Sequence, residues 1–137
     1  MDEDADSSER FNVSIGLHET FIVASATGEL DYSSAHLLRQ QVKDAWQATD
    51  SAGLVLDLGG VTFCDSIGVG VLVLLLRQSR EQHSNLVLSN LPPLLERILT
   101  ITGLRTAFLV EESVDEAIRT VQEAPQSTPP EDAEPSS

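Results

Sequence analysis

The sequence is poor in cysteine, in aromatic residues and in basic residues, and each shortage excludes a class of protein. A single cysteine among 137 residues rules out an internal disulfide and a thiolate metal cluster. Because aromatic residues make up only 4% of the chain, aliphatic side chains must fill the core. Eight lysines and arginines stand against 22 acidic residues, and the net charge of −14 disfavours nucleic acid as a partner.

The sequence also lacks a segment that could enter a membrane. Its longest apolar run, residues 69–76, is far shorter than the roughly 20 residues that span a bilayer. The amino terminus is acidic where a signal peptide would be basic and then apolar. We therefore expect a cytoplasmic protein without a membrane partner. Its acidity either favours a protein partner with a basic face or only keeps the chain in solution, and composition leaves both open.

Composition divides the chain into three parts. Residues 1–10 are charged and polar, and residues 124–137 mix proline, serine and acidic residues without apolar anchors. Both segments are predicted to be disordered tails. Residues 11–123 have the apolar content and length of one folded domain, and we find no internal repeat in them.

Within that domain, hydrophobic periodicity predicts alternating strands and helices. Strands are expected at 11–15, 21–26, 53–58, 86–88 and 106–110, and Gly28 is expected to end the second one. Helices are expected after the polar segment 31–34 and at 67–81, 94–102 and 114–121. The order predicts a single α/β domain, a mixed sheet of four to five strands packed against about four helices.

Residues 67–76 decide the site, because an unbroken apolar run can be a buried strand or a buried helix. A helix is favoured because Asp65 and Ser66, both good capping residues, precede the run. A serine at a helix start lies where backbone N–H groups and the helix dipole tolerate an anion. Local chemistry alone leaves two interpretations, a capping serine or an acceptor for phosphate. Gly68 and Gly70 would leave the first turn bare for a partner's close approach.

Four segments together resemble one family. Residues 61–72, VTFCDSIGVGVL, resemble the signature of the STAS domain, and in particular of bacterial anti-sigma factor antagonists. Residues 28–31, 55–58 and 97–104 resemble further family segments in the same order and spacing. The resemblance extends over residues 11–123. It implies the STAS-type fold and a regulatory protein that is not an enzyme.

The resemblance also implies a mechanism. Such antagonists bind an anti-sigma factor that is a serine kinase, which frees the sigma factor, and phosphorylation switches them off in stress-response partner switching. By position the phosphoacceptor here is Ser66, and a monomer or weak dimer is expected. Many relatives carry Ser or Thr where this chain has Ile67, so the chemistry rests on one hydroxyl. The implied partner-binding residues are Asp31, Asp65, Ser66, Ile67, Gly68 and Val69.

Other classes of protein find less support. A STAS scaffold or regulatory module without sigma-factor control is the main alternative. A phosphoreceiver built on Asp57 would need a nearby acidic pair and a lysine, and the one lysine, Lys43, lies in a predicted helix. The three histidines lack metal-ligand spacing, and no nucleotide-binding or serine-hydrolase motif occurs. Cys64 is expected to be a buried thiol rather than an oxidant sensor. We predict no catalytic residue, metal or cofactor.

Overall fold

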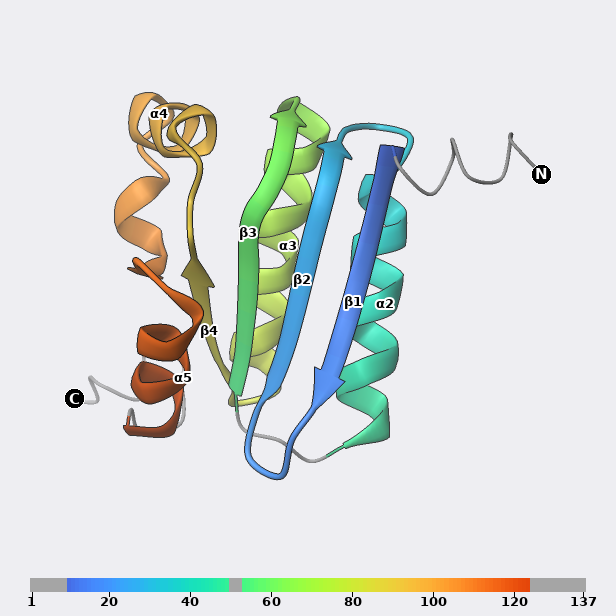
Figure 1. The fold of residues 1–137 in the computed structure, drawn as a ribbon, viewed down its shortest axis with the longest axis vertical. Coiled ribbons are helices and arrows are strands. Elements are labelled where there is room, and N and C mark those ends of the chain that lie inside the picture. The colour runs from blue at the N-terminus through green and yellow to red at the C-terminus, as the bar shows by residue number, and fades with distance from the viewer. Residues whose placement is uncertain (1–9, 50–52, 124–137) are drawn as a thin grey trace.

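A computed structural model describes residues 10–49 and 53–123 of the protein. Its five strands form one sheet in chain order, with β1 antiparallel to β2 and all later neighbours parallel (Figure 1). The sheet is therefore mixed, as predicted. The tails predicted at 1–10 and 124–137 lie outside the described residues except for Arg10. The strands are β1 (Phe11–Leu17), β2 (Ile22–Leu30), β3 (Gly53–Cys64), β4 (Asn85–Ser89) and β5 (Leu109–Glu111).

Four α-helices within the described part of the chain connect or follow the parallel strands. Helices α2 and α3 lie behind the sheet in Figure 1, and α5 lies on its other face. None of these described helices combines the length and apolarity needed to cross a membrane. The prediction of one α/β domain with about four helices is confirmed. They are α2 (Ala35–Ala48), α3 (Ser66–Glu81), α4 (Pro93–Ile101) and α5 (Val114–Glu123).

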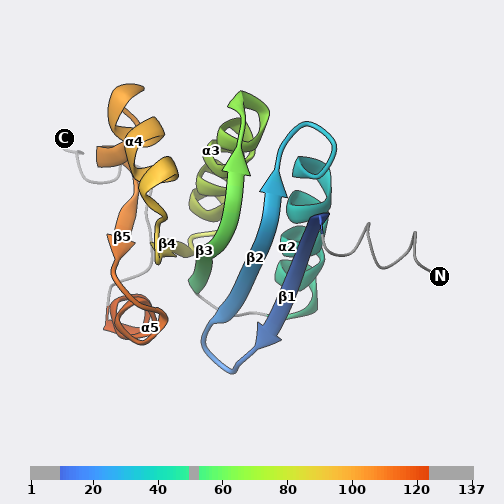
Figure 2. The ribbon, with the colours of Figure 1, turned by 45° about the horizontal axis from the view of Figure 1, so that its top comes forward.

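The apolar core divides into two unequal clusters on the two faces of the sheet. The larger cluster joins the sheet to α2, α3 and α4, and it includes the predicted helix face of Leu38, Val42, Ala45 and Trp46. The smaller cluster holds α5 against β3 and β4 through Val55, Val87, Ala117 and Val121. Figure 2 shows that no described helix lies over β1 and β2 on the α5 face. Helix α3 is thus fixed mainly by the larger cluster.

β2 and β3 extend furthest beyond their predicted ends, and both extensions position the site. β2 does not end at Gly28 but continues to Leu30. Gly28 has a φ of +100°, and a Cβ there would collide with the carbonyl oxygen of Arg10, so only glycine keeps the strand intact. β3 continues through Gly59 and Gly60 to Cys64 rather than ending at residue 58. A Cβ on Gly60 would lie 2.5 Å from the Cγ2 atom of Thr27 on β2, so glycine permits the pairing.

The last strand is shorter than predicted and begins later. A 3-10 helix at Arg105–Ala107 occupies the first half of the predicted segment, and β5 spans only three residues. The Arg105 Nε atom donates to the Glu96 Oε2 atom at 2.9 Å, which ties this turn to α4. Since that contact joins residues from two elements, strand propensity could not reveal it.

Candidate functional site at the start of helix α3

The site lies where β2 and β3 end and the chain enters α2 and α3. Because the two strands are parallel neighbours, their carboxyl ends meet at one edge of the sheet (Figure 2). The backbone N–H of Asp65 donates to the carbonyl oxygen of Leu30 at 3.3 Å. The end of β2 and the start of α3 are therefore joined directly.

Asp65 connects the β2–α2 loop and the start of α3 through its carboxylate. One oxygen accepts from the backbone N–H of Gly68 at 2.9 Å, which caps α3. The other oxygen accepts from the backbone N–H of Tyr32 at 3.1 Å, 33 residues away in sequence. Asp65, and not Ser66, is thus the capping residue. The sequence could not choose between two residues with similar capping preference.

Ser66 is the first residue of α3, and its side chain is exposed. With the cap supplied by Asp65, its hydroxyl has no hydrogen-bond partner among residues 10–49 and 53–123. The position still lies at the positive end of the helix dipole, beside the N–H groups of the first turn. The hydroxyl is accessible, and a negative group attached to it would be favoured electrostatically.

The other predicted residues of this turn differ in exposure: Ile67 is exposed, whereas Gly68 and Val69 are buried. Ile67 points outward with 53% of its surface exposed, an unusual position for a large aliphatic side chain. A Cβ on Gly68 would collide with the carbonyl oxygen of Leu30 and would lie 2.8 Å from the Cys64 Sγ atom. Gly68 therefore permits close packing of α3 on the strand ends.

Asp31 is held inside its own loop. Its Oδ1 atom accepts from the hydroxyl of Ser33 at 2.7 Å and from the backbone N–H of Ser33 at 2.9 Å. The Ser33 hydroxyl is the main reason that the pKa of Asp31 lies below its ordinary value, and further bonds from Ser33 and Ser34 act in the same direction. The Asp31 carboxylate thus shapes the β2–α2 loop, and the loop meets Asp65 through Tyr32.

Tyr32 is a candidate contact residue that sequence reasoning missed. It is the only tyrosine in the chain, and 76% of its surface is exposed next to the capped end of α3. Its side chain gave no periodic signal, because it lies in a loop. Its rarity in a sequence so poor in aromatic residues was the available clue, since tyrosine is enriched at protein interfaces.

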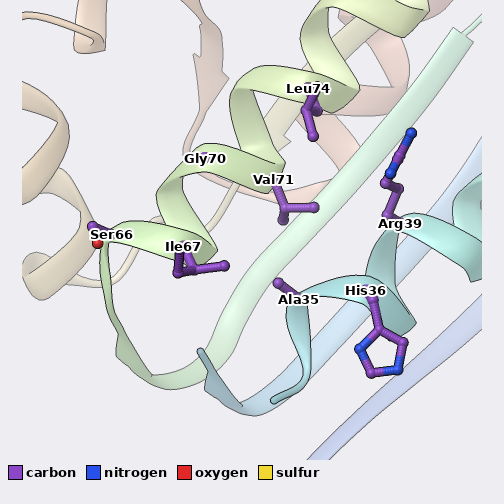
Figure 3. A pocket seen from close by; sticks show the side chains of 8 residues that line it. All are labelled: Ala35, His36, Arg39, Ser66, Ile67, Gly70, Val71 and Leu74. Atoms are coloured by element: carbon purple, nitrogen blue, oxygen red, sulfur yellow. The ribbon is translucent and has the colours of Figure 1, made fainter. Parts of the chain in front are cut away.

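Two grooves flank the start of α3, and Ser66 lines both of them. The first, the α2–α3 groove, has a volume of about 370 Å³ (Figure 3). The second, the α3–α4 groove, has a volume of about 210 Å³. The α2–α3 groove is lined by Ala35, His36, Arg39, Ser66, Ile67, Gly70, Val71 and Leu74, and the α3–α4 groove by Cys64, Asp65, Ser66, Val69, Ile98 and Thr102.

Cys64 lies under the site as a buried thiol, as predicted. Burial, assisted by the nearby Asp65 carboxylate, raises the pKa of the thiol to about 11. A thiol is a nucleophile or an oxidant sensor only as its thiolate. At neutral pH the thiolate is scarce, so Cys64 packs beneath α3 rather than reacting.

Asp57 is the residue on which a phosphoreceiver would depend, and in the structure its carboxylate accepts hydrogen bonds from two neighbouring residues. Its Oδ1 atom accepts from the backbone N–H of Gly59 at 3.0 Å and from the amide of Asn90 at 3.1 Å. Within the described ranges no three acidic, histidine or cysteine side chains are grouped to hold a metal ion. Asp57 therefore links the middle of β3 to Asn90, the residue that follows β4.

Most of the chain is similar in sequence to known proteins. Residues 12–117 match the sequence profile of the STAS domain. The chain is 35% identical over 94 residues to the anti-sigma-B factor antagonist of Bacillus subtilis, an alignment that covers 69% of this chain and 84% of the relative.

Solved structures show the same fold. An anti-sigma factor antagonist from Mycobacterium paratuberculosis has a TM-score of 0.74 at 23% identity, covering 84% of this chain and 97% of that one. The Bacillus cell fate determinant SpoIIAA in its phosphorylated form has a TM-score of 0.63 at 22% identity, covering 80% and 98%.

Proposed function

Because the chain belongs to the STAS domain family, we propose that it is an anti-sigma factor antagonist controlled by phosphorylation of Ser66. In its unmodified form it binds an anti-sigma factor of the serine kinase type in the cytoplasm, and the sigma factor is released. The kinase then phosphorylates Ser66, and the antagonist dissociates. The name of the Bacillus subtilis relative and the solved phosphorylated form of SpoIIAA support this role.

The observation that carries the proposal is the accessible, unpartnered hydroxyl of Ser66. A kinase requires a hydroxyl that can reach the γ-phosphate, and among the described residues nothing occupies this one. A phosphate there would add about −1.5 to −2 charges at neutral pH. The dipole of α3 tolerates that charge, so the phosphate would leave the fold intact and change only what can bind.

The proposed contact surface surrounds this hydroxyl. Tyr32 and Ile67 supply exposed apolar area on either side of the rigid link made by Asp65. Asp31 shapes the loop that carries Tyr32. Gly68 and Val69, expected from the sequence to contact the partner, are buried, and we propose that they act by shaping the turn.

The decisive experiment is incubation of the full chain with each serine-kinase anti-sigma factor of its source organism and ATP. Mass spectrometry should find one phosphate, on Ser66. Ser66→Ala should bind the same kinase and stay unmodified, whereas Ser66→Glu should bind at least about tenfold more weakly because a charge stands at the contact.

Ser14→Ala is the matched control, since Ser14 is another exposed serine and lies on β1, outside the proposed contact surface. It should be phosphorylated like the wild-type chain. A phosphate on another residue, or undiminished binding by Ser66→Glu, would refute the switch.

A further inference from the structure

The α2–α3 groove has a chemistry of its own. At about 370 Å³ it lies at the low end of the range for small-ligand sites. In Figure 3, Ile67 and Val71 extend from α3 toward Ala35 on α2, and they form an apolar floor. A groove of this size and composition accommodates aliphatic side chains of a bound molecule.

One end of the groove is basic in an otherwise acidic protein. Arg39 and His36 line it from α2, and none of its described lining residues is acidic. The Arg39 guanidinium has no ion pair or hydrogen bond with any described residue. An unpaired arginine beside an apolar floor favours an occupant that is aliphatic and carries a carboxylate.

Gly70 holds the groove open. It lies on α3 and is exposed, and a Cβ added to it would meet nothing within 4 Å. Glycine inside a helix lowers the stability of the helix by about 1 kcal/mol relative to alanine. Because Gly70 has no packing neighbour, close packing does not explain a glycine at this position. Its effect is to lower the wall of the groove.

The groove is continuous with the phosphoacceptor. Ser66 lines it at the start of α3, on the opposite side from Arg39 and His36 in Figure 3. An occupant of the groove therefore abuts Ser66. This continuity favours a segment of the protein that binds at Ser66 over an unrelated small molecule.

We infer that the α2–α3 groove binds a segment of the partner that presents aliphatic side chains and, toward Arg39, a carboxylate. The inference rests on the proposed function, since it assigns the groove to the same partner. It also gives the phosphate a second effect. A phosphate on Ser66 places negative charge in the lining of the groove and repels an acidic segment.

The test uses the anti-sigma factor that phosphorylates Ser66, with affinity measured by calorimetry on the full chain. Gly70→Leu, which fills the groove, and Arg39→Glu, which repels the carboxylate, should each weaken binding by about tenfold or more. Gln122→Leu and Arg119→Glu introduce the same side chains at exposed positions of α5, on the other face of the sheet, and should bind normally. Circular dichroism and urea unfolding check that the variants are folded.

The outcomes separate this inference from the proposed function. If Gly70→Leu and Arg39→Glu bind like the wild-type chain while Ser66 is phosphorylated, the groove is not used and the switch stands. If no anti-sigma factor binds the wild-type chain, the proposed function fails. A second measurement then decides the groove by itself.

That measurement titrates the labelled full chain with octanoate and, as a control, with octylammonium, followed by NMR. Octanoate should shift the amides of Arg39, Gly70 and Val71, and octylammonium should shift them much less. Gly70→Leu should abolish the octanoate response. Equal responses to both probes, or shifts elsewhere only, would overturn the inference.

Discussion

Two glycines in the first turns of α3 have opposite surroundings. On the inner side, Gly68 is buried between the carbonyl oxygen of Leu30 and the Cys64 thiol. On the outer side, Gly70 is exposed, and a Cβ there would have no neighbour within 4 Å. The inner side gives α3 a fixed position on the strand ends, and the outer side offers room to a binding partner. Glycine thus permits close packing of α3 at position 68 and leaves open space beside α3 at position 70.

The strongest test of this contrast is a methyl group on each side. Gly68→Ala forces Cβ into a backbone carbonyl oxygen, which the strand cannot easily yield, and should lower the free energy of unfolding by about 3 kcal/mol. Gly70→Ala meets no atom and should raise it by up to about 1 kcal/mol, because alanine favours the helix. Urea denaturation of both variants measures their free energies of unfolding. Equal changes in the two variants would contradict the difference in packing between Gly68 and Gly70.

The thiol under the inner side gives the next test. With its pKa at about 11 instead of 9.0, Cys64 should hold about a hundredfold less thiolate in the folded protein at pH 8. Its reaction with a disulfide reagent should therefore be slow and should speed up on unfolding. Gly70→Cys adds a thiol on the outer side as the control, and this variant should react in one fast and one slow phase. A single fast phase would show that Cys64 is accessible.

Asp65 joins the start of α3 to the β2–α2 loop, and its loss should have a moderate effect. Asp65→Ala removes both the helix cap and the bond to the Tyr32 amide, and should lower the free energy of unfolding by about 1–2 kcal/mol. Hydrogen exchange should accelerate at the amides of Tyr32 and Gly68. Ser66→Ala, one residue away, should leave both amides protected, and an equal effect of the two substitutions would contradict the assignment of the cap.

The smallest effect is expected from Asp31, whose bonds are exposed to solvent. Its pKa is lower in the folded protein, so its ionised form stabilises the fold above the ordinary value of 3.8. That contribution should disappear as the pH falls through the lower, folded value. At pH 7 the wild-type chain should have a slightly higher free energy of unfolding than Asp31→Asn. At pH 3 this difference should be smaller. A difference independent of pH would assign the effect to something other than ionisation.

Most elements of the fold follow from local patterns, since the helical spacing of Leu38, Val42 and Ala45 lies in one sequence window. The ends of β2 and β3 do not, because glycine in isolation disfavours a strand and therefore predicts an early end. The role of Gly28 and Gly60 depends on Arg10 and Thr27, which only the paired strands bring close. Tertiary contacts here override local propensity.

The candidate site also has features that the sequence predicts and features that it does not. The position of Ser66 at a helix start is readable from the sequence. The free hydroxyl is not, because it depends on Asp65 taking the cap. The groove is not readable either, since it arises where α2 and α3 lie side by side, with Arg39 and Gly70 on different helices.

If Ser66 is phosphorylated as we propose, the two hydrogen bonds of the Asp65 carboxylate fix the surroundings in which the kinase meets it. They join segments 33 positions apart, so the surroundings of the hydroxyl exist only in the folded chain. Under the proposed function, the kinase would therefore recognise a conformational epitope and not a linear consensus motif. A synthetic peptide of residues 61–72 lacks the β2–α2 loop and would present the serine without that epitope. Under the proposed function, substrate selection and folding quality control would coincide, because an unfolded chain would be neither bound nor phosphorylated.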